Sequence, residues 1–126
     1  MFTSCFARVK LLPPELSPVS IAVGTPRWFR GPQEPALMPT RAMLQMDTPT
    51  YARLFEEILR KADARAIADK WGPDAVFLCW ERPGAACHRR AVAEFLETQL
   101  GIDVPEWGAA SGRWVVPPFP RVRRSA

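Results

Sequence analysis

The sequence predicts a single α/β domain, and two observations support this prediction. Residues 75–80 are apolar throughout and few in number, which is typical of a strand buried inside a sheet. On both sides of this run, apolar residues recur at helical spacing. Strands that alternate with helices favour an α/β arrangement. A chain of 126 residues is long enough for one such domain with one core.

Two short strands are expected at the start of the chain. Residues 2–9 mix apolar and small polar side chains before a Pro-Pro pair, and residues 19–23 form a second β-rich run that a Gly-Thr-Pro sequence closes. Prolines then interrupt any helical or strand-like repeat of apolar residues over residues 24–47. This stretch is therefore expected to be a long ordered loop with one helical turn near residues 40–44.

Two helices are expected before the buried strand. Thr48-Pro49 matches a capping residue followed by proline at the first helical position, and apolar residues then recur at helical spacing as far as Ala62. Asp63 can cap a second, shorter helix, which a Gly-Pro pair ends.

A third helix is expected after the buried strand. Residues 88–100 place apolar side chains on one face, and Gly101 offers a left-handed C-cap. Residues 102–104 suggest a short edge strand. The predicted domain thus has its core over residues 2–106 and a C-terminal extension with a basic tail over residues 107–126.

Composition limits the class of protein and of partner. A hydrophobic content of 48% with five tryptophans excludes a disordered chain. The net charge of +4 makes an anionic partner plausible, whether nucleic acid, nucleotide phosphate or another anion. Part of that excess is the tail at residues 121–124, a kind of terminal run that is commonly solvated.

The expected compartment is the cytoplasm. Three cysteines, an odd number without a dense framework, are typical of a reducing compartment in which thiols stay free. No segment approaches the ~20 apolar residues that span a bilayer, and the start lacks a basic region followed by an apolar stretch. We therefore expect neither secretion nor a membrane partner.

The candidate site is Cys87-His88-Arg89-Arg90, which contains the only histidine of the chain. It lies where the buried strand leads into a helix, and helix N-termini at the carboxyl ends of strands attract anions. The helix start and the neighbouring cationic residues would stabilise a Cys87 thiolate, which suits a nucleophilic or redox role. The alternative is that Cys79 and Cys87 are small buried apolar residues.

The other members of this segment also have candidate roles. His88 suits a general base, a phosphate donor or a metal ligand, but a histidine at a helix start equally hydrogen-bonds a loop carbonyl. Arg89 and Arg90 point to different sides of a helix, so at most one is expected to enter a pocket. The spacing of Cys79 and Cys87 resembles no zinc motif, so we assign no metal. No glycine-rich phosphate loop or other cofactor fingerprint is present, so the cofactor stays unassigned.

Hydroxyl groups and further arginines are secondary candidates. Thr3, Ser4 and Ser20 can point into the same crevice, although ordinary strand and turn residues look the same. Arg8, Arg27 and Arg30 are further candidate anion contacts.

The segment Arg27-Trp28-Phe29-Arg30 combines cations with aromatic rings, which suits stacking on a nucleobase. Aromatic residues in a long loop more often anchor that loop to the core, and we favour that interpretation from the sequence.

The strand-loop-helix stretch over residues 77–96 resembles the signature of the domain-of-unknown-function family 488. Residues 3–8, 20–22, 26–28 and 101–106 also resemble its shorter members, so the similarity covers most of residues 2–106. One departure is Cys5, where an aromatic residue, typically tyrosine, is expected.

The resemblance implies a small Rossmann-like three-layer fold with a mostly parallel sheet, in a prokaryotic or phage setting. It implies no reaction. The positions that it marks as a functional motif are Cys79, Cys87, His88 and Arg89, and it adds the pocket candidates Thr3, Ser4 and Arg8.

The leading functional hypothesis is a strand-end pocket that holds a phosphate-bearing ligand, a nucleotide or nucleic acid. Cys87 and His88 are its candidate catalytic residues. The candidate binding residues are Arg89, Cys79, Thr3, Ser4, Arg8 and Ser20.

Two alternatives come from other classes of protein. One is a non-catalytic module that binds nucleic acid through Arg27, Arg30, Arg89 and the tail at residues 121–124. The other is a structural domain in which the Cys-His-Arg segment only braces the start of the helix. Whether the protein is an enzyme is left open, as is its oligomeric state.

Overall fold

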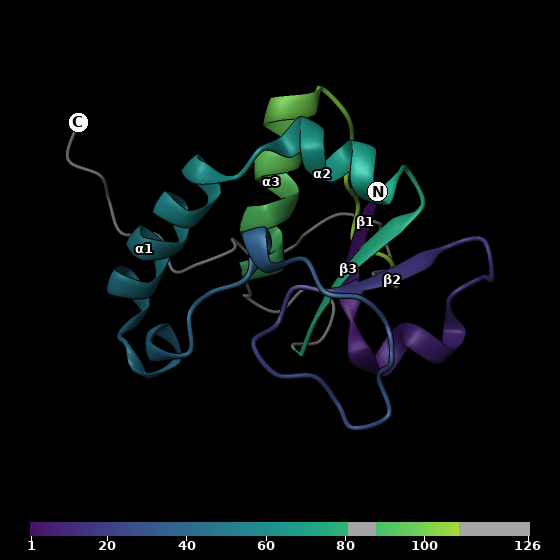
Figure 1. Cartoon of the computed structure of the whole chain (residues 1–126), viewed down its shortest axis with the longest axis horizontal. Coiled ribbons are helices and arrows are strands. Elements are labelled where there is room, and N and C mark those ends of the chain that lie inside the picture. The colour runs from purple at the N-terminus through teal and green to yellow at the C-terminus, as the bar shows by residue number, and fades with distance from the viewer. Residues whose placement is uncertain (81–87, 109–126) are drawn as a thin grey trace.

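The structure is a computed structural model that describes residues 1–80 and 88–108. Its centre is a parallel sheet in the order β1-β3-β2, formed by β1 (Phe2–Cys5), β3 (Ala75–Cys79) and β2 (Ser17–Ser20). Helices lie beside the sheet (Figure 1), so the predicted α/β class is confirmed. Because the three strands run in one direction, their carboxyl ends meet at one edge.

The central strand β3 explains why residues 75–79 are apolar without alternation. All five residues are buried, and they pair with a strand on each side. Ala75 and Phe77 pack into one hydrophobic cluster, whereas Val76 and Leu78 pack into another. A strand covered on both faces needs apolar side chains on both, and this is what the sequence supplies.

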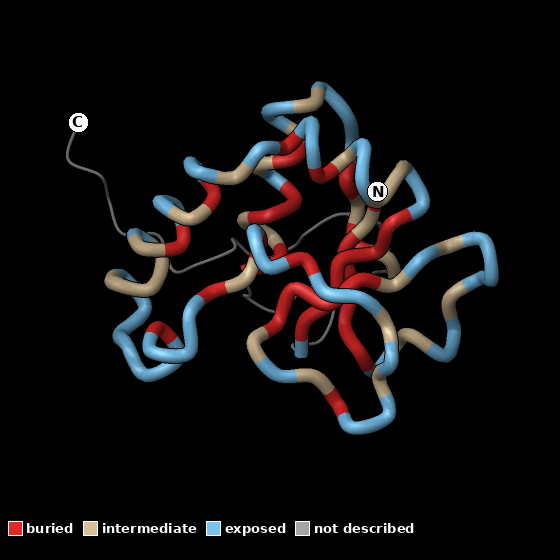
Figure 2. The backbone as a smooth tube through the Cα atoms, viewed as in Figure 1, coloured by how far each residue is buried: buried red, intermediate tan, exposed pale blue. Residues whose placement is uncertain are grey.

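Helices α1 (Thr48–Lys61), α2 (Ala64–Trp71) and α3 (His88–Leu100) lie on one side of the sheet, where α3 packs against β1 and β3 while α1 and α2 pack against α3. Their buried residues form the larger hydrophobic cluster with Phe77. Figure 2 shows that buried and exposed residues alternate along each helix, as expected for helices with one buried side. The cluster includes Phe55, Leu59, Ile67, Val92 and Leu96.

The other face is covered by shorter elements. The 3-10 helix η1 (Phe6–Leu11) follows β1, and Phe6 packs there against Val76 and Leu78, with Val9 and Phe29 at the margin.

Two further 3-10 helices, η2 (Pro35–Leu37) and η3 (Ala42–Gln45), lie in the long connection from β2 to α1. The second confirms the helical turn expected near residues 40–44. Among the described residues, no helix combines the length and apolar character needed to cross a bilayer.

Both predicted N-terminal strands have wrong bounds. The first ends at Cys5, whose partner Cys79 is the last residue of β3, so beyond it no neighbouring strand remains to pair with. The second is Ser17–Ser20 rather than residues 19–23. After Ser20 the chain turns away, because Ser20 bridges to Gln33.

The three predicted helices are confirmed, as are two of their caps. Asp63 accepts a hydrogen bond from the amide of Ala66 at 3.0 Å, and Gly101 ends α3 with a φ of +66°. At α1 the N-cap position is Asp47 rather than Thr48. The edge strand predicted over residues 102–104 does not form; instead Glu106 makes an isolated parallel bridge with Thr3.

Candidate functional site

The structure gathers most of the predicted site at the carboxyl edge of the sheet. Thr3 and Ser4 lie in β1, Ser20 ends β2 and Cys79 ends β3. The first residues of α3, His88 and Arg89, lie behind the same edge, and Arg8 lies on η1. Cys87 is outside the described residues, so its predicted catalytic role stays a prediction.

Arg89 is fully buried, and each of its three guanidinium nitrogens donates a hydrogen bond within the protein. Nε lies 3.1 and 3.0 Å from the two carboxylate oxygens of Glu106, and Nη2 lies 2.7 Å from Oε2. Nη1 lies 2.9 Å from Sγ of Cys79. Because a buried charge is stable only when it is paired, these bonds hold Arg89 to the fold.

Arg90 confirms that the two arginines diverge. Its guanidinium lies 3.5 Å from Glu94 and 4.0 Å from Glu97 on the same helix, at the protein surface rather than in the core.

The carboxylate of Glu106 also accepts a 2.7 Å hydrogen bond from Oγ1 of Thr3. Around it the backbone of residues 105–107 runs along β1, with the Thr3 amide donating to Pro105 and the Trp107 amide donating to Thr3. The Ser4 hydroxyl donates to the Trp107 carbonyl at 2.8 Å. The two β1 hydroxyls predicted to bind ligand therefore hold residues 104–108, which we call the strap.

His88 holds the chain that follows β2. Its Nε2 lies 2.8 Å from the carbonyl oxygen of Ile21, so Nε2 carries the proton and donates it. The ring packs edge-on against Phe55, with centroids 5.2 Å apart. Burial, with a smaller contribution from the charge of Arg89, lowers the pKa of His88 to about 4 although the Ile21 bond opposes the shift. His88 is therefore neutral at pH 7 and donates a hydrogen bond to a loop carbonyl, which is one of the roles predicted for it from the sequence.

Ser20 and Arg8 differ in what they offer a ligand. Ser20 is fully buried, and its Oγ accepts a 3.3 Å hydrogen bond from the amide of Ala22. Arg8 is half-buried, and its side chain lies beside Gly108 of the strap, where a positive φ of 94° favours glycine. Among the described candidates of the predicted pocket, Arg8 is thus the one that solvent reaches readily.

The cysteines do not match the expectation of free thiols throughout. Cys5 is a free, buried cysteine, whereas Cys79 is disulfide-bonded. A disulfide at Cys79 does not match the reducing compartment expected from the cysteine count. In the two described stretches, no three His, Cys, Asp or Glu side chains come close enough together to hold a metal ion.

A chain of aromatic rings lies in front of the sheet edge. Trp80 contacts Phe6 and Phe6 contacts Phe29, each pair edge-on with centroids 5.2 Å apart, and Phe29 contacts Trp28 at 6.3 Å. The two phenylalanines are largely buried, but the terminal tryptophans are 56% exposed at Trp80 and 49% exposed at Trp28. Core anchoring therefore describes Phe29 and not Trp28.

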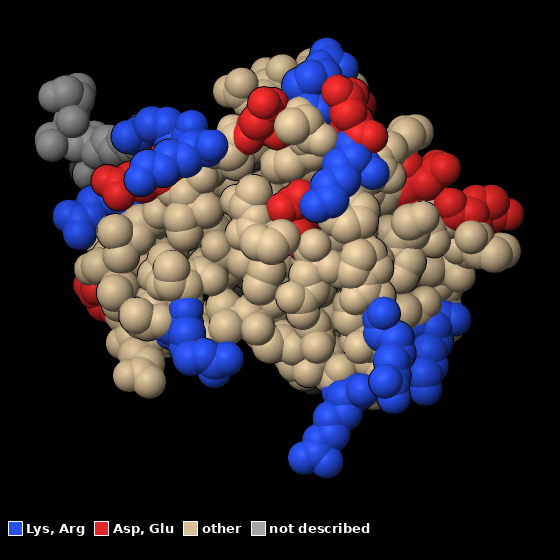
Figure 3. Space-filling model, viewed as in Figure 1, with Lys and Arg blue, Asp and Glu red and all other residues tan. Residues whose placement is uncertain are grey.

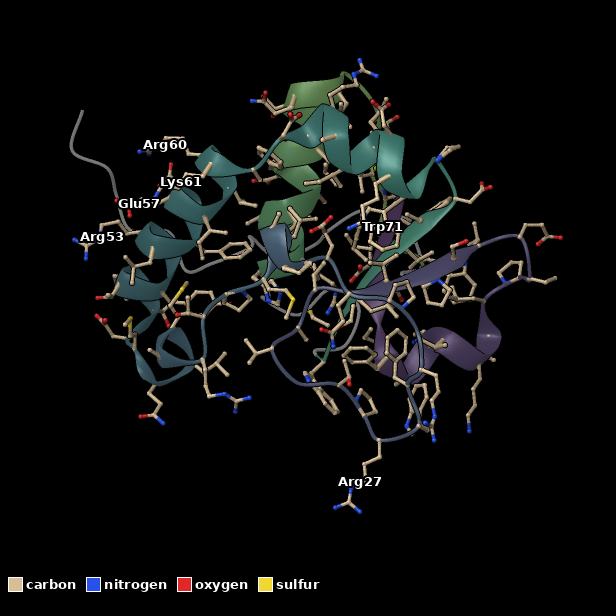
Figure 4. All side chains as sticks on the ribbon, viewed as in Figure 1. Arg27, Arg53, Glu57, Arg60, Lys61 and Trp71 are labelled. Carbon is tan, nitrogen blue, oxygen red and sulfur yellow. The ribbon has the colours of Figure 1, made fainter. Side chains whose placement is uncertain are left out.

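Basic side chains lie on the segments that carry Trp28, Phe29 and Phe6. Residues 1–33 contain four basic side chains and one acidic residue, Glu15, which precedes the opposite, amino end of β2. On the face that Figure 3 shows, Lys and Arg side chains gather below the sheet, and among the described residues drawn no Asp or Glu lies beside them. Arg27 points away from the body of the molecule in Figure 4. We define the strand-end surface as Arg8, Lys10, Arg27, Trp28, Arg30 and Trp80.

Two participants were missed in the sequence. Glu106 completes the Arg89 pair, and its signal is a lone carboxylate between apolar neighbours in an irregular segment. Trp80 was assigned to the end of the buried strand, but β3 ends one residue earlier, at Cys79. A large aromatic residue directly after a strand end is the signal that marks it.

The described residues also line a groove of about 540 Å³ between α1 and α3, which contains no residue of the predicted motif. It lies on the helical side, where Figure 4 labels Arg53, Glu57 and Arg60 far from Arg27. Comparisons of the chain with protein-family models, curated proteins and solved structures find no match.

Proposed function

We propose that this domain binds a phosphate-bearing ligand with an aromatic base, a nucleotide or nucleic acid, on the strand-end surface. The observation that carries the proposal is the pairing of two half-exposed tryptophans with four basic side chains at one edge of the sheet. Cations attract phosphate and tryptophan rings stack on bases, so the two residue types together match this chemistry.

The ligand is proposed to lie in front of the Cys-His-Arg segment rather than inside it. Arg89 donates to Glu106 and Cys79, and His88 is neutral and donates to Ile21. A phosphate that recruited Arg89 would leave the buried carboxylate of Glu106 without its partner, which is costly. The segment is instead proposed to support the surface, because α3 and the strap hold the elements that carry it.

Two finer expectations belong to the same proposal. The small parallel sheet with helices on one face and η1 on the other supports a Rossmann-like layered fold, and ligands of such sheets collect at the carboxyl edge. Membership of the domain-of-unknown-function family 488 is proposed on the residues quoted for the resemblance. Catalysis by Cys87 and His88 stays a prediction.

The test compares two double variants with the same change in charge. Arg27→Gln/Arg30→Gln alters the strand-end surface, whereas Arg53→Gln/Arg60→Gln alters exposed positions of α1. The probes are ATP and a fluorescently labelled single-stranded 12-mer, titrated at low and physiological salt.

The first variant is expected to weaken binding of at least one probe by about tenfold or more, since each lost phosphate contact removes a charge-assisted bond. The second is expected to change the dissociation constant less than twofold. Equal losses in both variants, or no measurable binding of either probe to the unaltered protein, would overturn the proposal.

A further inference from the structure

We infer that the ligand of the strand-end surface is a single-stranded nucleic acid, which stacks one base on Trp80 and another on Trp28. This inference rests on the proposed function and names its ligand class. It follows from the number, the separation and the anchoring of the exposed rings.

Trp80 is held as a platform before any ligand arrives. Its indole Nε1 donates a 2.8 Å hydrogen bond to the Gly24 carbonyl, and its ring edge contacts the buried ring of Phe6. The side chain nevertheless remains 56% exposed. An aromatic ring whose orientation is fixed loses little conformational entropy when a base stacks on it, so it is suited to recognition.

Trp28 provides a second platform at a distance from the first. Trp80 and Trp28 are the two ends of the four-ring chain through Phe6 and Phe29, and the three centroid separations are 5.2, 5.2 and 6.3 Å. Trp28 and Trp80 contact different rings of this chain, Phe29 and Phe6, so they offer two separate faces to bases. A mononucleotide can use one platform, whereas an oligonucleotide can use both with its backbone running between them.

The charges suit a phosphate backbone that passes both rings. Arg27 and Arg30 flank the Trp28–Phe29 pair in sequence, while Arg8 and Lys10 follow Phe6 on η1. The cations therefore come from two of the three segments that carry the ring chain, and positive charge beside stacking rings is what a groove that follows a phosphate backbone requires. In a duplex the bases are already stacked on one another, so their faces are closed to the two tryptophans.

The experiment measures binding of four probes to the full chain by fluorescence anisotropy and competition: AMP, a single-stranded DNA 12-mer, the RNA 12-mer of the same sequence and the DNA duplex. The unaltered protein is expected to bind at least one of the single strands about tenfold or more tightly than both AMP and the duplex.

Variants then assign the platforms. Trp28→Ala and Trp80→Ala are each expected to weaken single-strand binding by about tenfold, because a stacked base is lost in each case. Leu44→Ala is the control, since Leu44 is 56% exposed but lies on η3. It is expected to leave binding unchanged.

Trp80→Phe keeps a ring at this position but removes the indole donor to Gly24, and it guards against loss of fold in the alanine variant. It is expected to retain the thermal midpoint and to bind the single strand with an affinity between those of Trp80→Ala and the unaltered protein.

The outcomes separate this inference from the proposal beneath it. If AMP binds as tightly as the single strands, or if neither tryptophan variant weakens binding by folded protein, the single-strand inference is overturned while nucleotide binding stands. If the duplex binds most tightly, base stacking is overturned as the mode of recognition. If no probe binds, both the inference and the proposed function fail.

Discussion

His88 and Arg89 each bind a different part of the chain. His88 donates to the Ile21 carbonyl beyond β2, and Arg89 binds Glu106 in the strap. Both bonds are buried, so removing either side chain leaves a buried partner without its hydrogen bond, which lowers the free energy of unfolding. We therefore expect substitutions of His88 or Arg89 to lower stability more than they weaken ligand binding.

The single histidine should make stability depend on pH. The pKa of His88 is about 4 in the native state and near 6.5 when the chain is unfolded, so between these values the unfolded chain binds the extra proton. Stability is therefore expected to fall as pH drops from 6.5 towards 4, by about 3 kcal/mol from this group. Urea unfolding at a series of pH values measures it.

The control for this prediction is His88→Gln, which retains a side-chain N–H for the Ile21 carbonyl but does not titrate. The difference in unfolding free energy between the two proteins should shrink as pH falls. A constant difference from pH 7 to pH 4.5 would contradict the assigned pKa.

Replacing only one member of the Arg89–Glu106 pair should lower the free energy of unfolding more than replacing both. Glu106→Gln leaves the buried guanidinium without a counter-charge and is expected to lower the free energy of unfolding by about 3–5 kcal/mol. The double variant Arg89→Met/Glu106→Gln removes the orphaned charge, so it should be more stable than Glu106→Gln alone. Urea unfolding of both variants at pH 7 tests this order, and the reverse order would contradict a buried, mutually dependent pair.

At the scale of elements, the caps of α1 and α2 offer a matched comparison. Asp63 caps α2 by accepting from the Ala66 amide, whereas Asp47 at the N-cap of α1 makes no such side-chain bond. Asp63→Ala should therefore destabilise the protein by about 1 kcal/mol. Asp47→Ala should cost only the few tenths that a charge near the helix dipole contributes. Thermal unfolding of the two variants under identical conditions decides between them, and equal losses would contradict the assigned cap.

The strap is an element that local sequence does not reveal. Residues 104–108 form an irregular segment that contains Pro105, yet Glu106 makes a parallel bridge with Thr3. Two backbone hydrogen bonds and the Glu106 carboxylate hold it to β1. A contact between residues 3 and 106 is set by the course of the whole chain, so helical or strand periodicity cannot predict it.

At the scale of the whole molecule, the basic side chains of the strand-end surface should produce a salt dependence. For single strands, log K falls by about 0.7 per log unit of salt for each phosphate neutralised. Lys10→Gln should therefore reduce the slope by about 0.7. The measurement is a titration of the labelled single strand from about 50 to about 300 mM NaCl, over which the Debye length shortens by more than about twofold.

Lys61→Gln on α1 is the matched control, because it removes a lysine that is also exposed from another part of the molecule. It should leave the slope unaltered. If both lysines changed the slope equally, the attraction would come from the net charge of +4 and not from a localised surface.

Much of the fold could be predicted, and the reason is local. The apolar run of β3, the spacing of α1 and α3, and the caps Asp63 and Gly101 depend on neighbouring residues. The bounds of β1 and β2 could not be predicted, because a strand ends where its neighbour ends. For the same reason Phe6, which resembles a strand residue, begins a 3-10 helix on the far face of the sheet.

For the site, the sequence by itself determined that histidine, arginine and hydroxyl side chains would meet at the carboxyl edge of a parallel sheet. That much follows from strand direction and from the start of α3. Only the tertiary structure decided how they are used. Because Arg89 is buried, its charge is paired with Glu106, and burial also keeps His88 neutral. Trp28 and Trp80 are instead exposed. The burial of each of these side chains is set by the tertiary structure and not by its neighbours in sequence.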